Sequence, residues 1–514
     1  MPIESDCTVS EIEDFLQKNI AQVLHQPKNN IDVYLPLENF ALDSLQIQHF
    51  LANVEDVLQI KIDNDLIINF ENIKEIANYL FTCINEQKYE SDFSKFNVFS
   101  NINHKKIEKK RSAENYTDFE KYSPYLELKN MQVTLGNDIF FDAQEGVSGS
   151  TCIINSKEYL NFTSYNYLGL AAHPEVVSAS CDAIRQYGTS VSASRLVSGQ
   201  KIIHQELEWE LAKLLGVEDA VVFTCGHATN VMTIAHLYGP GDLVLHDELA
   251  HNSLVLGAEY SNARRISFPH NDWQALDNIL NRERSFYRRV LIVIEGVYSM
   301  DGDIPPLDKF IEVKNRHAAW IMIDEAHSIG VLGESGKGIG EHYGINPFDV
   351  DIWMGTLSKS LASCGGYIAG KKELIEYLKY TCPGFVFSAG LCPANAAAAL
   401  ASIKVMGKEN ERVKQLKELS QLARKTAIHY GFDIGLNENT PILPIILGNS
   451  QKCIHVSRQC FEHGLNVKPI IYPAVPENSA RLRFFITAIH TPDQILKSFE
   501  ILSQSHAKFI SLSL

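Results

Sequence analysis

The stretch DIWMGTLSKSLASCGG, residues 351–366, joins an apolar run to a lysine, Lys359, that lies among small residues. A lysine that only reaches into water needs no such neighbours, whereas one that bonds a flat ring or lies beside a phosphate needs backbone and hydroxyl groups close by. Thr356 and Ser358 supply two hydroxyls. The pattern predicts a buried strand over 351–356 and a chemical task for the amine that follows it.

Four similar apolar runs precede this stretch. They are AVVFT (220–224), LVLHD (243–247), VLIVIEG (290–296) and AWIMIDEAH (319–327), separated by helical or turn-rich segments. Continuous apolar strands with intervening helices predict an α/β fold with a mainly parallel sheet. In such a sheet the functional groups gather at the carboxyl ends of the strands.

Polar residues follow each of these strands. After AVVFT, Gly226 and His227 open a glycine turn into a helix, whose free N–H groups suit a phosphate. His251 follows LVLHD, at a position where a histidine is more often a hydrogen-bonded core residue. Asp324 and His327 follow WIMI and can face one ligand. Because a buried Asp without a partner is costly, a cationic partner is implied.

Together with Lys359, these groups fit a pyridoxal 5'-phosphate (PLP) site. PLP needs a lysine for its aldehyde, a carboxylate for its ring nitrogen and a cluster of donors for its phosphate. Each motif alone is common, whereas the ordered set is specific.

The first part of the chain reads as a separate acidic module. Residues 1–90 hold 16 Asp and Glu against 5 Lys and Arg, a net charge of −11 of the total −16. Apolar residues at helical spacing predict a small all-α bundle over 1–87, with a first helix capped by Ser10, a second from Asp43 and a third from about Asn72. The segment 88–125 is rich in Lys, Asn and Ser and predicts a flexible linker.

Ser44 lies in the tripeptide Asp43-Ser44-Leu45 at the predicted start of a helix. A lone DSL is usually a plain helix cap. In an acidic bundle, ahead of FEN-x3-IANYL, it resembles the acyl carrier proteins, although Ala41 stands where that family often has glycine. The resemblance implies 4'-phosphopantetheine attached covalently to Ser44, with an acyl group held as a thioester.

From about residue 126 onward the chain resembles the α-oxoamine synthases, the PLP-dependent family of 8-amino-7-oxononanoate synthase and serine palmitoyltransferase. The motifs are NFTSYNYLGL, SASRLVSG, GHATN, DELAHNSL, EGVYSMDGD, IDEAHSIGVLGESGKG, GTLSKS and RLRFFITAIHT. The resemblance implies a fold-type I PLP-dependent transferase, with a large PLP-binding domain and its N-terminal segment over 126–410 and a small C-terminal α+β domain over 411–514.

The resemblance also implies roles for matching residues. Lys359 bonds the cofactor and later acts as the base, Asp324 pairs with the ring nitrogen, His327 donates to the ring hydroxyl and His251 stacks on the ring. Cofactor contacts are further implied for Gly226, His227, Ser299, Thr356, Ser358 and Ser388, and substrate contacts for Asn166, Ser194 and Arg483. Arg481 is the alternative to Arg483, and Ala389 removes a hydroxyl that relatives use beside Ser388.

The implied reaction is a decarboxylating Claisen condensation of a small amino acid (serine, alanine or glycine) with an acyl thioester, giving an α-amino ketone in lipid or secondary metabolite biosynthesis. The carrier module is the expected acyl donor, with free acyl-CoA as the alternative. Rivals are an aminotransferase or decarboxylase on the same fold, and a carrier or scaffold protein with an inactive catalytic half.

Expected partners are a second copy of the chain in a homodimer, an acyl-loading enzyme and a phosphopantetheinyl transferase. The acidic N-terminus and the lack of a long apolar run predict a cytoplasmic protein with no membrane span. The ten cysteines show no CxxC or metal spacing, which predicts structural thiols and no metal site. We expect no nucleic-acid partner.

Overall fold

The computed structural model of the chain describes residues 8–24, 27–28, 31–34, 50, 53–54, 57–58, 72–86, 116–135 and 140–512. The chain divides into two compact units, 1–116 and 117–514, so the boundary falls inside the predicted linker. The 3-10 helix η4 (Tyr116–Lys121) and the helix α5 (Ser123–Leu135) lie at this boundary. The domain limits 87/88, 125/126 and 410/411 stay predictions.

The N-terminal unit contains the helices α1 (Val9–Val23) and α4 (Ile73–Glu86), which pack against each other. The cap of α1 is Thr8 and not Ser10, because Thr8 exchanges hydrogen bonds with Glu11 in a capping box. The predicted helix from Asp43, with Ser44, lies outside the described residues. Among the described residues of this unit, the buried apolar side chains form one core, as predicted: Ile12, Leu16, Ile20, Ala21, Val23, Ile31, Phe50, Val54, Leu58, Ile73, Ile76, Ala77 and Leu80.

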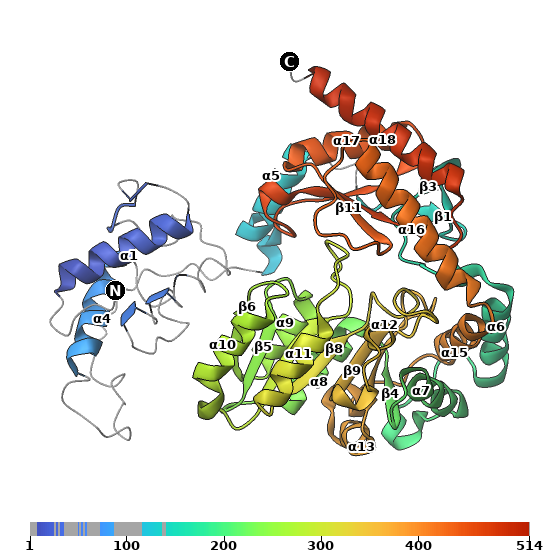
Figure 1. Cartoon of the computed structure of the whole chain (residues 1–514), viewed down its shortest axis with the longest axis horizontal. Helices are drawn as coiled ribbons and strands as arrows, with labels where there is room; N and C mark the ends of the chain where they lie inside the picture. Colours follow the sequence, from blue (N-terminus) through green and yellow to red (C-terminus); the bar gives the residue numbers. More distant parts are fainter. Residues whose placement is uncertain are drawn as a thin grey trace. The chain divides into compact units, whose positions relative to one another are not determined.

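The larger unit is built on a seven-stranded sheet with the order β4-β10-β9-β8-β7-β5-β6. Figure 1 shows β6, β5, β8, β9 and β4 in this unit. Its strands are β4 (Asp219–Phe223), β5 (Leu243–Asp247), β6 (Arg264–Phe268), β7 (Val290–Glu295), β8 (Trp320–Asp324), β9 (Ile352–Thr356) and β10 (Gly366–Gly370). Strands β6, β5, β7, β8 and β9 are parallel, while β10 pairs antiparallel with β9 and with β4. The mainly parallel sheet and all five predicted strands are confirmed.

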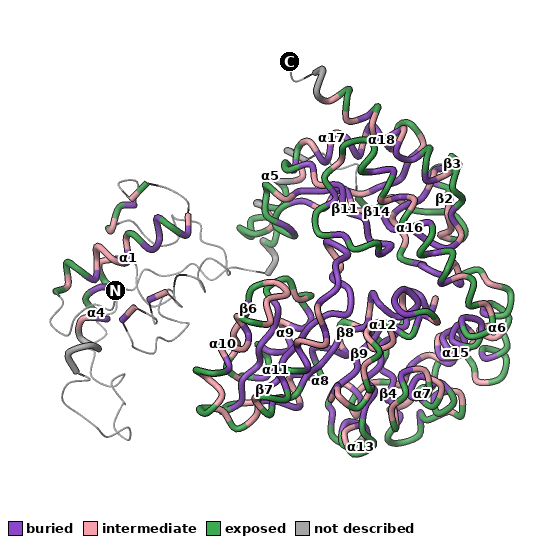
Figure 2. Tube along the Cα trace, viewed as in Figure 1, coloured by how far each residue is buried: buried purple, intermediate pink, exposed green. Residues whose placement is uncertain are grey.

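Apolar cores cover both faces of this sheet. Its strands are buried along most of their length, except the edge strand β6, which is buried only at Phe268 (Figure 2). Ala220 and Val222 of β4 belong to one core, and Val221 and Phe223 to the other. This explains why the strands are continuously apolar instead of alternating. One core packs on α7 (Ile202–Leu215), α10 (Trp273–Glu283), α11 (Leu307–Arg316) and α15 (Pro393–Lys408); the other packs on α8 (Gly226–Leu237), α9 (Asn252–Tyr260), α13 (Lys372–Thr381) and α14 (Pro383–Val386).

The C-terminal part combines helices with two small sheets, as predicted for an α+β region. It contains α16 (Glu411–His429), β11 (Ile442–Ile446), α17 (Ser450–Glu462), β12 (Leu465–Asn466), β13 (Lys468–Ile470), β14 (Arg481–Phe485) and α18 (Pro492–Leu512). One sheet has the order β11-β14-β13. The other has the order β1-β2-β3-β12 and takes β1 (Gln144–Glu145), β2 (Thr151–Ile154) and β3 (Lys157–Asn161) from the segment before the large sheet.

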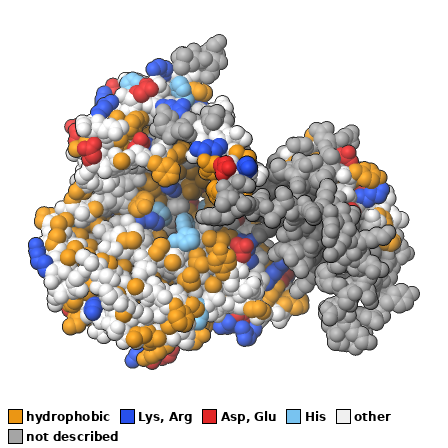
Figure 3. All heavy atoms as spheres, turned by 180° about the vertical axis from the view of Figure 1, so that it is seen from behind, with side chains coloured by type: hydrophobic (Ala, Val, Ile, Leu, Met, Phe, Trp, Pro, Cys, Tyr) orange, Lys and Arg blue, Asp and Glu red, His pale blue; other side chains and the backbone are white. Residues whose placement is uncertain are grey.

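The remaining elements are short or peripheral: η5 (Leu170–Ala172), α6 (Pro174–Tyr187), the π-helix η6 (Arg195–Gly199), η7 (Arg284–Phe286), α12 (Ile339–Tyr343), η8 (Pro347–Asp349) and η9 (Glu477–Ser479). Within the described ranges no helix is long and apolar enough to cross a membrane. Figure 3 shows hydrophobic side chains reaching the surface at many places on one face, with charged side chains scattered between them.

Candidate active site

The carboxyl ends of β7, β8 and β9 bring the predicted catalytic residues to one edge of the sheet. Asp324 is the last residue of β8 and lies in register with Glu295 of β7 and Met354 of β9. His327 follows three residues after Asp324, and Lys359 follows three residues after the end of β9. The parallel order of the strands therefore places these groups together.

The amine of Lys359 lies in a desolvated environment. Burial lowers the pKa of Lys359 to about 8, although Asp324 and Glu295 favour its charged form. Its Nζ lies 5.9 Å from the centre of the Tyr165 ring. A substantial fraction of the amine is therefore neutral near neutral pH, which is the form that attacks a carbonyl.

The Asp324 carboxylate is 4% exposed, and among the described residues it accepts hydrogen bonds from neutral donors. Asn230 Nδ2 donates to Oδ2 at 2.8 Å, and the Ala326 N–H donates to Oδ1 at 2.9 Å. These bonds orient the carboxylate but leave its charge without a bonded cation. A protonated ring nitrogen is a cation that would pair with the Asp324 carboxylate.

His327 is buried and hydrogen-bonded to a tyrosine. Its Nδ1 lies 2.8 Å from the hydroxyl of Tyr167. Burial, together with the charges of Lys359 and Arg483, lowers the pKa of His327 well below its ordinary value. A neutral ring whose Nδ1 is engaged by Tyr167 leaves Nε2 for a ligand.

His251 is the N-cap of α9 and is held on two sides. Its backbone N–H donates to Glu295 Oε1 at 2.6 Å, and its Nδ1 lies 2.7 Å from Ser253 Oγ. Its ring meets the ring of His227 edge-on at 6.2 Å. Burial lowers the pKa of His251, which favours a neutral imidazole, and a neutral ring can stack on a cationic pyridine ring without repulsion between like charges.

The predicted phosphate contacts meet at the start of α8. Gly226 lies so close to Thr356 that a Cβ on Gly226 would be 2.8 Å from Thr356 Oγ1. Thr356 Oγ1 donates to the Gly365 carbonyl at 3.0 Å and accepts from the Ser358 N–H at 3.2 Å. No side chain caps α8. Its N–H groups and two hydroxyls therefore share a small space, as an anion requires.

Two neighbouring arginines on β14 differ in their partners. Arg481 donates from Nη1 to Asp301 Oδ1 at 2.7 Å, within an ion pair. Arg483 donates from Nη1 to the Ser299 carbonyl at 2.8 Å, and its guanidinium lies 4.8 Å from the centre of the Phe485 ring. The Arg483 Nε is buried without a hydrogen-bond partner among the described residues, and burial lowers the pKa of Arg483.

Three further predicted residues have side chains that hydrogen-bond the backbone of the chain. Asn166 holds its own loop, since its side chain bonds the Ser148 carbonyl and the Ala171 N–H. Ser194 Oγ donates to the Val386 carbonyl at 2.6 Å, and Ser388 Oγ donates to the adjacent Ala389 carbonyl at 3.2 Å. Asn166 nevertheless adjoins Tyr165, which lies over Lys359.

A half-buried histidine, His270, joins two loops that carry residues of the site. It lies 2.8 Å from Asp247 at the end of β5 and 2.7 Å from Asp303, in the turn that follows Ser299. Burial opposes the charge, but the bonds to both carboxylates outweigh it and raise the pKa of His270 to about 10. The imidazolium thus ties together the loops that carry His251 and Ser299.

Sequence reasoning did not single out Glu295, Asn230, Tyr167 or His270. Glu295 ends a buried strand just as Asp324 does, so the same rule applied to β7 finds it. The other three bond residues distant in sequence, and no local pattern reports such bonds.

The described residues fit PLP. A desolvated lysine, a buried carboxylate that lacks a bonded cation, and an uncapped helix start beside two hydroxyls are the donor set that PLP requires. The fold and site define the class of fold-type I PLP-dependent enzymes.

Comparisons with known proteins agree. The family profile "Aminotransferase class I and II" matches residues 157–502. The 8-amino-7-oxononanoate synthase of Thermoanaerobacter pseudethanolicus is 38% identical over 359 residues, 69% of this chain and 90% of that protein. The serine palmitoyltransferase of Sphingobacterium spiritivorum is 37% identical over 361 residues, 70% of this chain and 90% of that protein.

The structure of serine palmitoyltransferase from S. paucimobilis with bound PLP–myriocin has a TM-score of 0.72 and 29% identity, and covers 76% of this chain and 98% of that one. The chain therefore belongs to the α-oxoamine synthases within the aminotransferase class I and II family.

The N-terminal part matches a second family, "Phosphopantetheine attachment site", over residues 14–80. This match confirms the carrier module predicted from the sequence. The cofactors of the chain are thus PLP and 4'-phosphopantetheine. The attachment residue Ser44 stays a prediction.

Proposed function

We propose that the protein condenses a small amino acid (serine, alanine or glycine) with an acyl group carried by its own N-terminal module, releasing carbon dioxide and an α-amino ketone. The observation that carries this proposal is the desolvated Lys359 amine beside the buried Asp324 carboxylate. The amino acid loses its α-proton and its carboxylate, the carrier thioester is broken, and the thiol is released.

Bound PLP supplies an electron sink for the α-carbon of the amino acid. Lys359 would hold PLP, and its Nζ would take the α-proton of the substrate and return a proton after carbon dioxide leaves. Asp324 keeps the ring nitrogen protonated through its free charge. Neutral His251 would stack on the PLP ring and His327 would donate to its hydroxyl, so that the two histidines hold the ring in place.

Arg483 is the better candidate for the substrate carboxylate. The charge of Arg481 is balanced by Asp301, whereas among the described residues Arg483 has carbonyl, sulfur and aromatic contacts and no carboxylate. A buried guanidinium that lacks an anion favours an anionic ligand. Asn166 and Ser299 line the same region in this proposal.

The phosphate of PLP is assigned to Gly226, His227, Thr356 and Ser358. Their closeness at the start of α8 supports this assignment. Ser388 is assigned to the PLP phosphate of a partner subunit in a homodimer. It lies on a loop where the side chain of Phe387 is 86% exposed, and exposed apolar side chains of this kind favour burial in an interface.

The carrier module is assigned to residues 1–87, the linker to 88–125, the PLP-binding region to 126–410 and the small domain to 411–514. Because η4 and the start of α5 take up the end of the predicted linker, a coil over residues 88–115 spans about 30 Å on average. Tethering then raises the concentration of the thioester at the active site to the order of millimolar. A phosphopantetheinyl transferase and an acyl-loading enzyme are the partners this scheme requires, and lipid or secondary metabolite biosynthesis is its setting.

The intact polar set at the sheet edge opposes the hypothesis of an inactive catalytic half. Ser194 remains the candidate that selects the amino acid side chain. Its hydroxyl is engaged by Val386, so it acts in this proposal through its size and position.

Peptide mapping before and after borohydride reduction tests the proposal. The protein is produced with a phosphopantetheinyl transferase and PLP. We expect the pantetheine arm on Ser44 and reduced PLP on Lys359. An unmodified Lys359 contradicts the enzymatic function, and an unmodified Ser44 leaves free acyl-CoA as the donor.

A further inference from the structure

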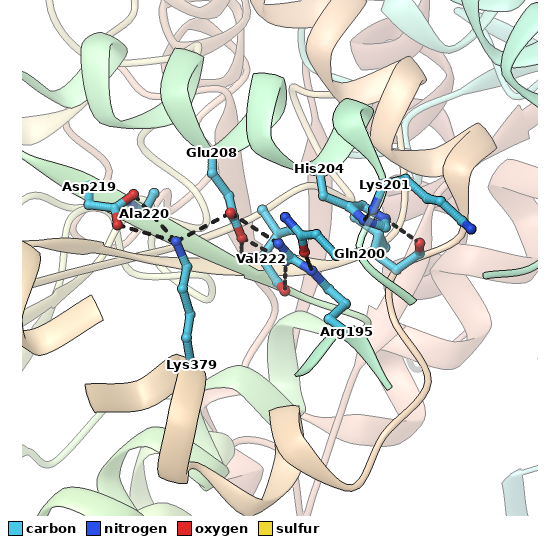
Figure 4. A network of polar contacts seen from close by, with 10 residues as sticks. Arg195, Gln200, Lys201, His204, Glu208, Asp219, Ala220, Val222 and Lys379 are labelled. Carbon is cyan, nitrogen blue, oxygen red and sulfur yellow. Dashed lines mark hydrogen bonds and ion pairs between the residues drawn. The ribbon is translucent and has the colours of Figure 1, made fainter. Parts of the chain in front are cut away.

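The guanidinium of Arg195 is the centre of a buried polar network (Figure 4). It is 5% exposed and binds Glu208 of α7 through two hydrogen bonds, from Nη1 at 2.6 Å and from Nη2 at 3.1 Å. Its Nε donates to Gln200 Oε1 at 2.7 Å. Glu208 in turn accepts from the Val222 N–H of β4 at 3.0 Å and pairs with Lys379 at 3.4 Å. The network thus anchors the π-helix η6 to the large sheet.

This anchored segment is bonded along its length to the loop after α14. The Ser194 hydroxyl donates to the Val386 carbonyl at 2.6 Å, and the Gly390 N–H donates to the Ala193 carbonyl at 3.2 Å. His204 Nε2 lies 2.7 Å from the Leu391 carbonyl. Residues 386–391 are therefore held at both ends.

Arg195 also contacts both ends of the loop directly. Its guanidinium lies 5.0 Å from the centre of the Phe385 ring, at the start of the loop. At the other end, a Cβ on Gly390 would meet Arg195 Cγ at 2.6 Å, so the backbone of Gly390 packs directly on the Arg195 stem. Arg195 thus bonds Glu208, lies over the Phe385 ring and packs on Gly390. A planar guanidinium suits these three contacts better than a lysine would.

We propose that Arg195 is a positioning residue that acts across the subunit boundary, by holding the loop 386–391 so that Ser388 reaches the PLP phosphate of the partner subunit. This inference rests on the homodimer in the proposed function. In this inference Arg195 supports PLP binding in the partner subunit and not in its own subunit.

Mixed dimers made from two differently tagged chains test this inference. In the first dimer, one chain carries both Lys359→Ala and Arg195→Gln and the other is unmodified. The one remaining lysine then faces the altered loop. In the second dimer the two changes lie on different chains, so the remaining lysine faces an unaltered loop. PLP affinity is read from borohydride trapping on Lys359 at varied PLP concentration.

We expect the first dimer to bind PLP about tenfold more weakly than the second, because one hydrogen bond to a charged group is worth roughly that factor. The second dimer should bind PLP as tightly as a reference dimer in which one chain carries Lys359→Ala and the other is unmodified. Equal constants for the two dimers, or weaker binding in the second, overturn the inference. A protein that traps PLP on Lys359 but sediments as a monomer also overturns it.

Two further measurements keep the test decisive. If the Arg195→Gln chain does not fold, Glu208→Gln removes the same bidentate pair with less disturbance and takes its place. Arg289→Gln, which breaks an ion pair with Asp242 elsewhere on the sheet, is the matched control and should leave both dimers alike. Failure of the Lys359→Ala reference dimer to trap any PLP contradicts the proposed function instead.

Discussion

Replacing the two β14 arginines one at a time should give opposite phenotypes. Arg483→Gln removes a buried cation that has no carboxylate partner among the described residues. A charge-assisted contact with the substrate carboxylate is worth about 1.5–3 kcal/mol. The KM for the amino acid should therefore rise about 10- to 150-fold, since 1.4 kcal/mol is a factor of ten. The stability of the protein should change little.

Arg481→Gln should lower the stability of the protein and leave the KM for the amino acid nearly unchanged. It leaves Asp301, whose side chain is 11% exposed, without its cation. Removing one partner of a buried pair costs about 3–5 kcal/mol. The thermal midpoint should fall, while the KM of the remaining folded enzyme stays near its original value. Steady-state kinetics at varied amino acid and thermal unfolding measure both effects. A raised KM in Arg481→Gln with normal kinetics in Arg483→Gln would refute the assignment.

Three further perturbations follow from the site. The rate of PLP trapping on Lys359 in protein freed of PLP should rise with pH up to about 8 and then level off, because the neutral amine predominates above that pKa; a rate independent of pH between 6 and 9 contradicts the lowered pKa. The His270→Asn variant should lose stability most below pH 6.5, and the deficit should shrink as pH rises towards about 10, because a raised pKa stabilises the fold only while the ring is charged in the folded state. Midpoints of thermal unfolding across this range check the sign. Gly226→Ala places a Cβ 2.8 Å from Thr356 Oγ1 and should weaken PLP binding at least about tenfold with little loss of stability, as equilibrium dialysis can measure.

The large sheet was predictable because each buried strand is continuously apolar and ends in a polar residue. That pattern located β4, β5, β7, β8 and β9 together with Asp324 and Lys359. The antiparallel β10 was not predicted, since GYIAG contains two glycines and lacks the continuous run of large apolar residues that marked the other strands. A small C-terminal α+β domain was expected, but the pairing of β3 with β12 was not, because the two strands lie about 300 residues apart in the chain and local patterns do not report such pairing.

Some residues of the candidate site could be predicted from the sequence and others could not. Residues adjacent to strand ends were found from the sequence, whereas their supports were not. Tyr167, Asn230 and His270 act through contacts with residues distant in the chain, and each is an ordinary polar residue in its own segment. The choice between Arg481 and Arg483 likewise depends on Asp301, whose position beside one of them only the fold reveals.

The most direct test of the account is a single turnover on protein whose pantetheine arm carries an acyl group. Intact mass is recorded before and after addition of serine, alanine or glycine, with no acyl-CoA present. The account predicts that one amino acid removes the acyl mass from the arm and that an equal amount of α-amino ketone and carbon dioxide appears. An acyl arm that persists with every amino acid, while added acyl-CoA is converted to the same ketone, would contradict the carrier as donor.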